Sequence, residues 1–128
     1  VMNFTLLRDS YSVCRYGPEE MPALDFSGQE LMCAARTAEE TSVVCRSGAA
    51  SGAARIEDGW RALRIDGPLD FGLVGILAEA SGRLAVAGIS IFALPTFDTD
   101  YILVKEARLA DAIAALKSGG HVVRDRPA

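Results

Sequence analysis

Hydrophobic residues in the second half of the chain follow first a helical and then a strand-like period. Over residues 73–87 they fall at offsets of three, four, seven and eleven, on one side of a 3.6-residue helix; they are Leu73, Ile76, Leu77, Ala80, Leu84 and Ala87. Gly88 is expected to end this helix, because glycine enters the left-handed conformation of many helix ends without a Cβ penalty. The apolar residues 89–94 and 101–104 predict two strands, joined by a polar turn at residues 96–100.

Further elements complete this half of the chain. Residues 60–66 alternate between apolar and polar side chains, which predicts a half-buried strand. Residues 107–116 carry a second helical stripe, ended by Ser118-Gly119-Gly120, and residues 121–123 are expected to return as an edge strand. The order β-α-β-β-α-β predicts an α+β fold of the ferredoxin-like class. We expect both helices on one face of an antiparallel sheet, with the other face free to meet a partner.

The first half of the chain is predicted to be mostly β. Its expected strands are residues 3–7, 11–16, 30–36 and 42–46, with Asp9-Ser10 as a hairpin turn between the first two. Thr37 is expected to cap one helical turn, because Glu40 follows it three residues later as in a capping box. Residues 47–54 are small, contain glycine and lack periodicity, which predicts a loop at a subdomain boundary. We therefore expect two units, residues 1–59 and residues 60–128.

Composition and charge narrow the classes of function. The chain has 128 residues, half of them apolar, and a net charge of -4. An acidic chain with scattered cations has no general attraction to phosphate backbones, so nucleic acid is not an expected partner. Apolar runs fall short of the roughly 20 residues that span a membrane, and residues 1–7 lack the charged start of a signal peptide. These features favour a soluble, cytoplasmic protein without a membrane partner.

The three cysteines are interpreted as structural thiols. Cys14, Cys33 and Cys45 are widely spaced and flanked by apolar or small residues, as is typical of reduced thiols that act as small hydrophobes. A zinc site needs closely spaced Cys or His pairs, and the sequence has none. Asp98 and Asp100 have carboxylates for a cation, but the sequence offers no third or fourth oxygen ligand beside them. Neither a cofactor nor a metal is expected.

Two long segments resemble ACT domains. They read GWRALRIDGPLDFGLVGILAE and LAVAGISIFALPTFDTDYILVKEARLADAIAALKSGGH. The resemblance is to a small bacterial tandem-ACT family, to which the arginine-sensing CASTOR proteins of animals are also similar. YSVCRY and RTAEETSVVC resemble the degenerate first ACT-like repeat of that family, so the likeness covers nearly the whole chain. The chain departs from the family pattern at Thr41, Arg83 and Pro95, where leucine, proline and serine are usual.

The resemblance implies a non-catalytic regulatory module that binds a small effector, usually an amino acid, between two ACT units. By motif, the loop before the first helix contributes Asp70, Phe71, Gly72, Leu73 and Gly75, the turn contributes Thr96, Phe97 and Asp100, and the neighbouring strand contributes Ser90 and Ile91. Helix N-termini with glycine-containing loops bind anions, so an amino-acid carboxylate would fit at residues 72–75. Asp70 or Asp100 would accept hydrogen bonds from an ammonium or guanidinium group.

Structural interpretations of these residues stay open beside the functional one. The glycines relieve crowding where the helix meets the sheet, the aspartates build the turn, Phe71 and Phe97 are core or interface aromatics, and Ser90 is an outward-facing strand residue. His121 is the single histidine, and no nucleophile elbow or phosphate loop is present, so an enzyme is not expected. The alternative function is a ligand-free adaptor that docks on a partner enzyme or transporter.

A homodimer is also expected. Residues 89–94 are apolar at both alternating sets of positions except Ser90, and a strand that is apolar on both faces needs a second cover. A four-stranded sheet of this size also leaves an edge strand without protection.

Overall fold

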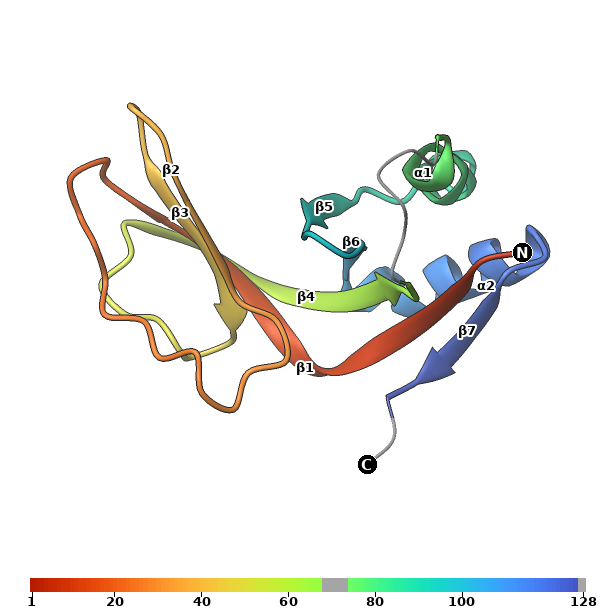
Figure 1. Ribbon diagram of the computed structural model, residues 1–128, viewed down its shortest axis with the longest axis horizontal. Helices are drawn as coiled ribbons and strands as arrows, with labels where there is room; N and C mark the ends of the chain where they lie inside the picture. The colour runs from red at the N-terminus through yellow and green to blue at the C-terminus, as the bar shows by residue number, and fades with distance from the viewer. Residues whose placement is uncertain (68–73, 127–128) are drawn as a thin grey trace. The chain divides into compact units, whose positions relative to one another are not determined.

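The computed structural model describes residues 1–67 and 74–126 (Figure 1). Its elements are β1 (Asn3–Tyr16), β2 (Cys33–Arg36), β3 (Thr41–Arg46), β4 (Arg55–Ile65), α1 (Ile76–Val86), β5 (Phe92–Pro95), β6 (Asp100–Lys105), the 3-10 helix η1 (Glu106–Arg108), α2 (Leu109–Ser118) and β7 (Val122–Asp125). Within the described residues, no helix is long and apolar enough to cross a membrane.

The chain forms two compact units. The larger unit consists of Val1–Arg8 and Arg61–Ala128, and the smaller unit consists of Asp9–Trp60. Residues 1–8 thus belong with the C-terminal half, whereas the sequence places them with the N-terminal half. The long strands β1 and β4 each contribute residues to both units.

The larger unit has the predicted β-α-β-β-α-β order, from the end of β4 to β7. The described strands of this unit are hydrogen-bonded side by side in the order β7-β1-β4-β6-β5. The first residues of the chain therefore form an additional strand between β4 and β7. β1 pairs with β7 in parallel, with Phe4 opposite Val123, and β5 pairs with β6 antiparallel. The fold is an α+β, ferredoxin-like fold with one strand added from the N-terminus.

The core of the larger unit lies between the sheet and both helices. Its fully buried side chains come from the sheet strands β1, β4 and β6, from α1 and α2, and from the segment before β5; they are Phe4, Leu63, Ala80, Leu84, Ile102, Val104, Ala112 and Leu116, with Ile65 and Ile89 almost fully buried. The predicted apolar stripes at residues 80 and 84 and at residues 112 and 116 are confirmed. Gly88 ends the first helix with a φ of 73°, also as predicted. Both helices therefore cover one face of the sheet.

The opposite face of this sheet is not open along its centre. Leu7, Ala62 and Leu103 alternate with helix-facing residues, and each has no exposed surface in the single chain. Thr5, on the same side, is 2% exposed. This face of the sheet therefore also carries buried side chains.

The smaller unit contains the predicted β-rich half, but its first hairpin is absent. β1 runs without interruption through Asp9 and Ser10. A two-residue hairpin turn usually needs positive φ, and every described residue with positive φ is a glycine. Residues 11–16 of β1 instead pair antiparallel with β3, and β3 pairs with β2. The prediction of a turn at Asp9-Ser10 is therefore wrong.

Several predicted boundaries move by a few residues. β5 begins at Phe92 rather than at residue 89, β2 begins at Cys33 rather than at residue 30, and β4 begins five residues before Trp60. The helical turn predicted after Thr37 is absent. The Thr37 hydroxyl accepts hydrogen bonds from the Glu39 and Glu40 amides at 3.1 Å, but a bend follows it.

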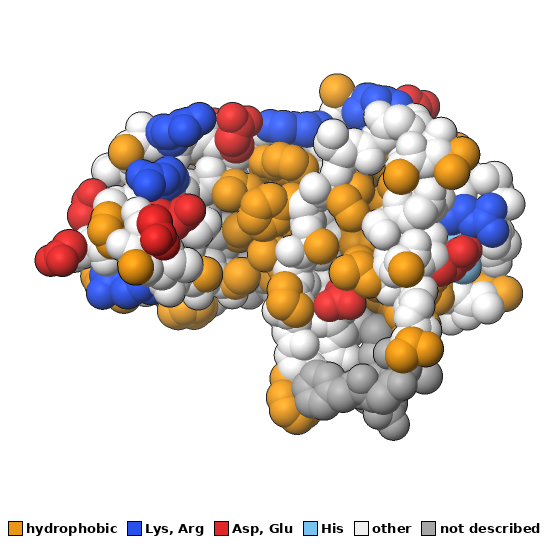
Figure 2. Space-filling model, turned by 90° about the horizontal axis from the view of Figure 1, so that it is seen from above, with side chains coloured by type: hydrophobic (Ala, Val, Ile, Leu, Met, Phe, Trp, Pro, Cys, Tyr) orange, Lys and Arg blue, Asp and Glu red, His pale blue; other side chains and the backbone are white. Residues whose placement is uncertain are grey.

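Charged side chains are mixed on the surface. On the face shown in Figure 2, basic and acidic side chains alternate over the described residues, without a contiguous basic surface in that view.

Candidate functional site

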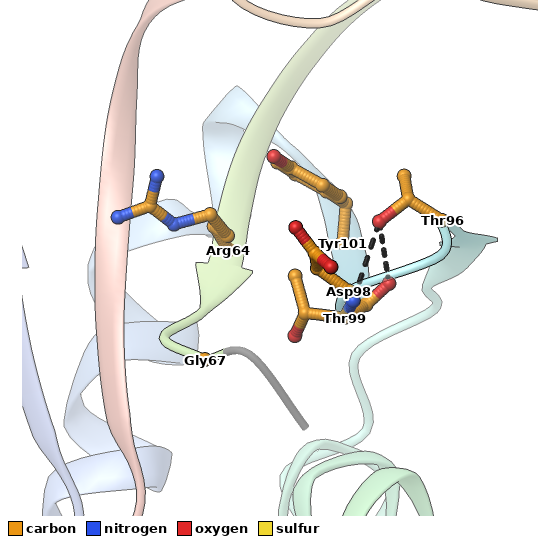
Figure 3. A pocket seen from close by; sticks show the side chains of 6 residues that line it. All are labelled: Arg64, Gly67, Thr96, Asp98, Thr99 and Tyr101. Carbon is orange, nitrogen blue, oxygen red and sulfur yellow. Dashed lines mark hydrogen bonds between the residues drawn. The ribbon is translucent and has the colours of Figure 1, made fainter. Parts of the chain in front are cut away.

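A pocket of about 260 Å³ lies at the end of β4, beside the turn between β5 and β6 (Figure 3). Its lining residues are Arg64, Gly67, Thr96, Asp98, Thr99 and Tyr101. Gly67 is the last described residue before the predicted ligand loop. Among the described residues, the end of β4 and the β5–β6 turn therefore form the pocket.

Hydrogen bonds within the turn hold its shape. The Thr96 hydroxyl donates to the Thr99 carbonyl at 2.9 Å and accepts from the Thr99 amide at 3.3 Å. The Thr99 hydroxyl is buried and donates to the Ile65 carbonyl at 2.6 Å, which ties the turn to the end of β4. A turn with a fixed backbone presents Asp98 and Tyr101 at defined positions.

Two polar side chains from the turn and from β6 face this pocket. Figure 3 shows the Asp98 carboxylate and the Tyr101 ring on the side of the turn, across from the stem of Arg64. Asp98 is exposed and Tyr101 is half-buried. The carboxylate offers acceptors to an ammonium or guanidinium group, and the phenol serves as donor or acceptor.

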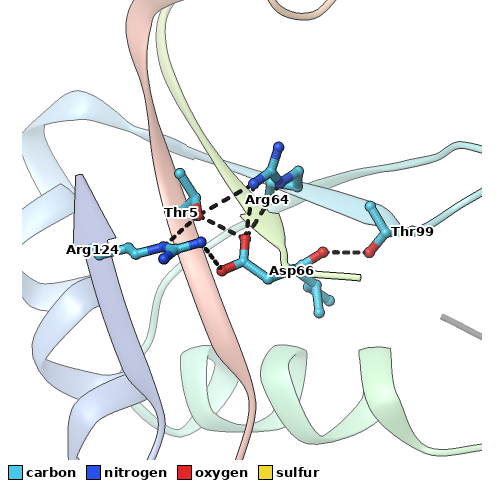
Figure 4. Close-up of polar contacts among 6 residues, drawn as sticks. Thr5, Arg64, Asp66, Thr99 and Arg124 are labelled. Atoms are coloured by element: carbon cyan, nitrogen blue, oxygen red, sulfur yellow. Dashed lines mark hydrogen bonds and ion pairs between the residues drawn. The ribbon is translucent and has the colours of Figure 1, made fainter. Parts of the chain in front are cut away.

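The Arg64 guanidinium is held in a polar cluster on the strands (Figure 4). It contacts Asp66 Oδ1 at 3.1 Å, and the Thr5 hydroxyl donates to the same oxygen at 2.7 Å. Arg124 from β7 contacts Asp66 Oδ2 at 3.2 Å. Asp66 thus fixes an arginine that lines the pocket, and it links β4 to β1 and β7.

Gly75, the last residue of the predicted anion-binding loop, directly precedes the first helix. Gly75 is the N-cap residue with a φ of 81°, a conformation that favours glycine, and its carbonyl accepts the Glu79 amide at 2.9 Å. Hydrogen bonds from Arg83 and His121 lower the pKa of Glu79. His121 also accepts the Met2 amide through Nδ1 at 3.1 Å. The first turn of α1 is therefore connected to both ends of the chain.

The predicted site residues are only partly brought together. Thr96 lines the pocket, and Gly75 directly precedes the first helix. Phe97 is 80% exposed, and Asp100 begins β6 opposite Pro95 and is not among the pocket's lining residues. Ser90 is exposed and Ile91 packs against the core. The predicted residues Asp70, Phe71, Gly72 and Leu73 lie outside the described residues.

Among the residues that line the pocket, sequence reasoning named only Thr96 as a ligand residue; it missed Arg64, Gly67, Asp98, Thr99 and Tyr101. Arg64 follows the alternation of its strand, so its pattern resembles that of any exposed strand residue. Asp98 and Thr99 lie between the predicted residues Phe97 and Asp100, and Tyr101 follows Asp100. A motif match in this turn carries no information about side-chain direction. Over residues 1–67 and 74–126, no group of three or more His, Cys, Asp or Glu side chains is arranged to hold a metal ion.

A sequence profile of the ACT domain matches residues 55–118, which is half of the chain. The chain belongs to the ACT-domain family. This ACT chain is 42% identical over 59 residues to the human protein named cytosolic arginine sensor for mTORC1 subunit 1, and 39% identical over 59 residues to the rat protein of that name. Each match covers 45% of the ACT chain and 18% of the relative, so the chain aligns with less than a fifth of these relatives.

Solved structures share the fold of this ACT chain. A protein of Agrobacterium tumefaciens superposes with a TM-score of 0.87 at 28% identity, covering 99% of this chain and 95% of that one. The aspartate kinase of Synechocystis gives a TM-score of 0.70 at 18% identity, covering all of this chain and 28% of the kinase. A protein of Vibrio cholerae gives 0.68 at 21% identity, covering 91% of this chain and 88% of that one. The last two likenesses concern the fold alone.

Proposed function

We propose that this chain is a non-catalytic regulatory module that binds an amino-acid effector. The observation that carries the proposal is the 42% identity with a protein named as an arginine sensor, over a segment of 59 residues within an ACT-family chain. The pocket beside the β5–β6 turn supports it, because a carboxylate, a hydroxyl and a tethered arginine gather there. These groups suit a zwitterionic ligand better than an apolar one.

In the proposed pose, the ligand has the orientation that the sequence predicts. The ligand carboxylate lies on backbone amides at residues 72–75, of which Val74 and Gly75 are described, and the cationic end meets the β5–β6 turn. Asp98 is the preferred partner of that cation because it lines the pocket, whereas Asp100, the residue preferred from the sequence, does not. Ser90 and Ile91 of a second ACT unit are proposed to close the site.

A homodimer is part of this proposal. β5 is the outermost described strand of the larger unit on its side of the sheet, and its Ala93 and Pro95 are exposed. Phe97, in the turn that follows, is 80% exposed. Pairing with a second copy would cover this edge. Sedimentation at micromolar concentration is expected to show a dimer, and a monomer there would contradict this part of the proposal.

A thermal-shift panel of the twenty amino acids tests the effector directly. A ligand that binds only the folded state adds about 2.7 kcal/mol to its stability at 100 times the dissociation constant. We expect one amino acid, or one chemical class of them, to raise the melting temperature. A flat response to all twenty would favour the ligand-free adaptor.

Matched aspartate variants then test the pose. Loss of a charge-assisted hydrogen bond of roughly 1.5–3 kcal/mol weakens binding by about tenfold to more than a hundredfold. Asp98→Asn is expected to show this loss, and Asp111→Asn, an exposed change in α2, is the control. Asp100→Ala shows whether the second carboxylate binds ligand or only builds the turn. Wild-type affinity in both turn variants would refute the pose.

A further inference from the structure

The smaller unit brings two cysteines together that are 31 positions apart in the sequence. Ser12 of β1 is opposite Cys45 of β3, and Cys14 is opposite Val43, so the two cysteines are diagonal neighbours on one face. Both belong to the same core cluster, in which Cys14 is 2% exposed and Cys45 has no exposed surface. Cys33 lies on β2, outside this buried cluster and half-buried.

The two thiols line a pocket of about 180 Å³ together with Ser12 and Asp58. The Asp58 carboxylate accepts a hydrogen bond from the Ser12 hydroxyl, so it is held at this pocket. Burial raises the pKa of Cys14 to about 11, and the neighbouring Cys45 and Asp58 contribute to that rise.

A disulfide does not suit this pair. Diagonal neighbours on an antiparallel pair have Cα atoms about 7–8 Å apart, whereas disulfides usually join Cα atoms about 4.4–6.8 Å apart. Two metal–sulfur bonds of about 2.3 Å, the length in zinc thiolates, span about 4.6 Å, compared with about 2.05 Å for a sulfur–sulfur bond. An ion between the two sulfur atoms therefore fits the diagonal better than a direct bond.

We propose that Cys14 and Cys45 form a two-coordinate site for a soft monovalent cation, for which Cu(I) is the physiological candidate. Thiolate ligands select Cu(I) among the common metal ions, while zinc needs four ligands. Among the described residues no third His, Cys, Asp or Glu side chain completes such a set. Binding replaces two S–H protons with two metal–sulfur bonds, so each Cu(I) releases two protons and no electron is transferred.

Anaerobic titration of the intact chain with Cu(I), in competition with the chelator bicinchoninate, tests this site. The wild type and Cys33→Ala are expected to bind one ion per chain, and Cys14→Ala and Cys45→Ala are expected to lose binding. Cys33→Ala is the matched control because it removes a half-buried thiol from another strand. Failure of the wild type to compete, or loss of binding in Cys33→Ala, would overturn the proposal.

A second measurement is independent of whether the core variants fold. X-ray absorption of copper-loaded Cys33→Ala is expected to show two sulfur ligands, and titration in weak buffer is expected to release two protons per ion. One proton, or none, would overturn the proposal, because thioether sulfur of methionine binds copper without losing a proton.

Discussion

Replacement of Asp66 by Asn removes the charge at the centre of the polar cluster on β1, β4 and β7. The Asp66 side chain is 17% exposed, and one of its oxygens receives the Thr5 hydroxyl at 2.7 Å and the Arg64 guanidinium at 3.1 Å. Arg124 reaches the other oxygen, but it is 65% exposed. Asparagine keeps the shape but loses the charge and one acceptor oxygen.

The expected loss of stability follows from the exposed fractions of these side chains. Hydrogen bonds to a charged group contribute about 1.5–3 kcal/mol each, and their sum is reduced because they share one carboxylate. The exposed pair with Arg124 adds about 0–1 kcal/mol. Asp66→Asn should therefore lower the free energy of unfolding by about 2–4 kcal/mol.

Urea unfolding at neutral pH measures this change against a control. Arg124→Gln removes only the exposed pair and should cost less than about 1 kcal/mol. A double-mutant cycle with Thr5→Val should show coupling between Thr5 and Asp66. An Asp66→Asn protein within about 0.5 kcal/mol of the wild type would refute the view that this cluster stabilises the larger unit.

Three further changes have defined outcomes. Leu84→Ala in α1 should cost about 2.7–5 kcal/mol because Leu84 is fully buried, whereas Val86→Ala on the same helix, 92% exposed, should change urea stability by less than about 0.5 kcal/mol. The pKa of Glu79 is lowered, so the stability that its carboxylate contributes is present at neutral pH and is lost as pH falls below the ordinary pKa of 4.5. Acid titration should therefore destabilise the wild type more than Glu79→Gln. The raised pKa of Cys14 gives the opposite dependence of stability on pH. The stability that its protonated thiol contributes is lost as pH rises from 9.0 towards about 11, so alkaline unfolding should show this loss in the wild type but not in Cys14→Ala.

The larger unit was predictable because its signals are local. Leu84 and Ala80 fall on one helical stripe, and Gly88 ends that helix for a reason that lies in its own backbone. Such features need no knowledge of distant residues. The same holds for the turn at Thr96, whose hydroxyl bonds within its own four residues.

Features that depend on distant pairing were not predictable from one sequence. Asp9-Ser10 resembles a hairpin turn, but β1 continues and pairs with β7 at residues 3–6 and with β3 at residues 11–16. Arg64 was missed at the pocket for the same reason, since its role depends on Asp66 and on a turn 32 or more positions away. The approach of Cys14 to Cys45 follows only from the register of β1 on β3.

The proposed binding of an amino acid by this ACT chain can be measured by isothermal titration calorimetry. The intact wild-type chain is titrated with each of the twenty amino acids, and with the D-enantiomer of the amino acid that stabilises it most. The account predicts saturable binding of the L-amino acid with a stoichiometry set by one site per chain or per dimer, and much weaker binding of the D-enantiomer. Absence of saturable heat for all twenty amino acids, at concentrations up to several millimolar, would contradict it.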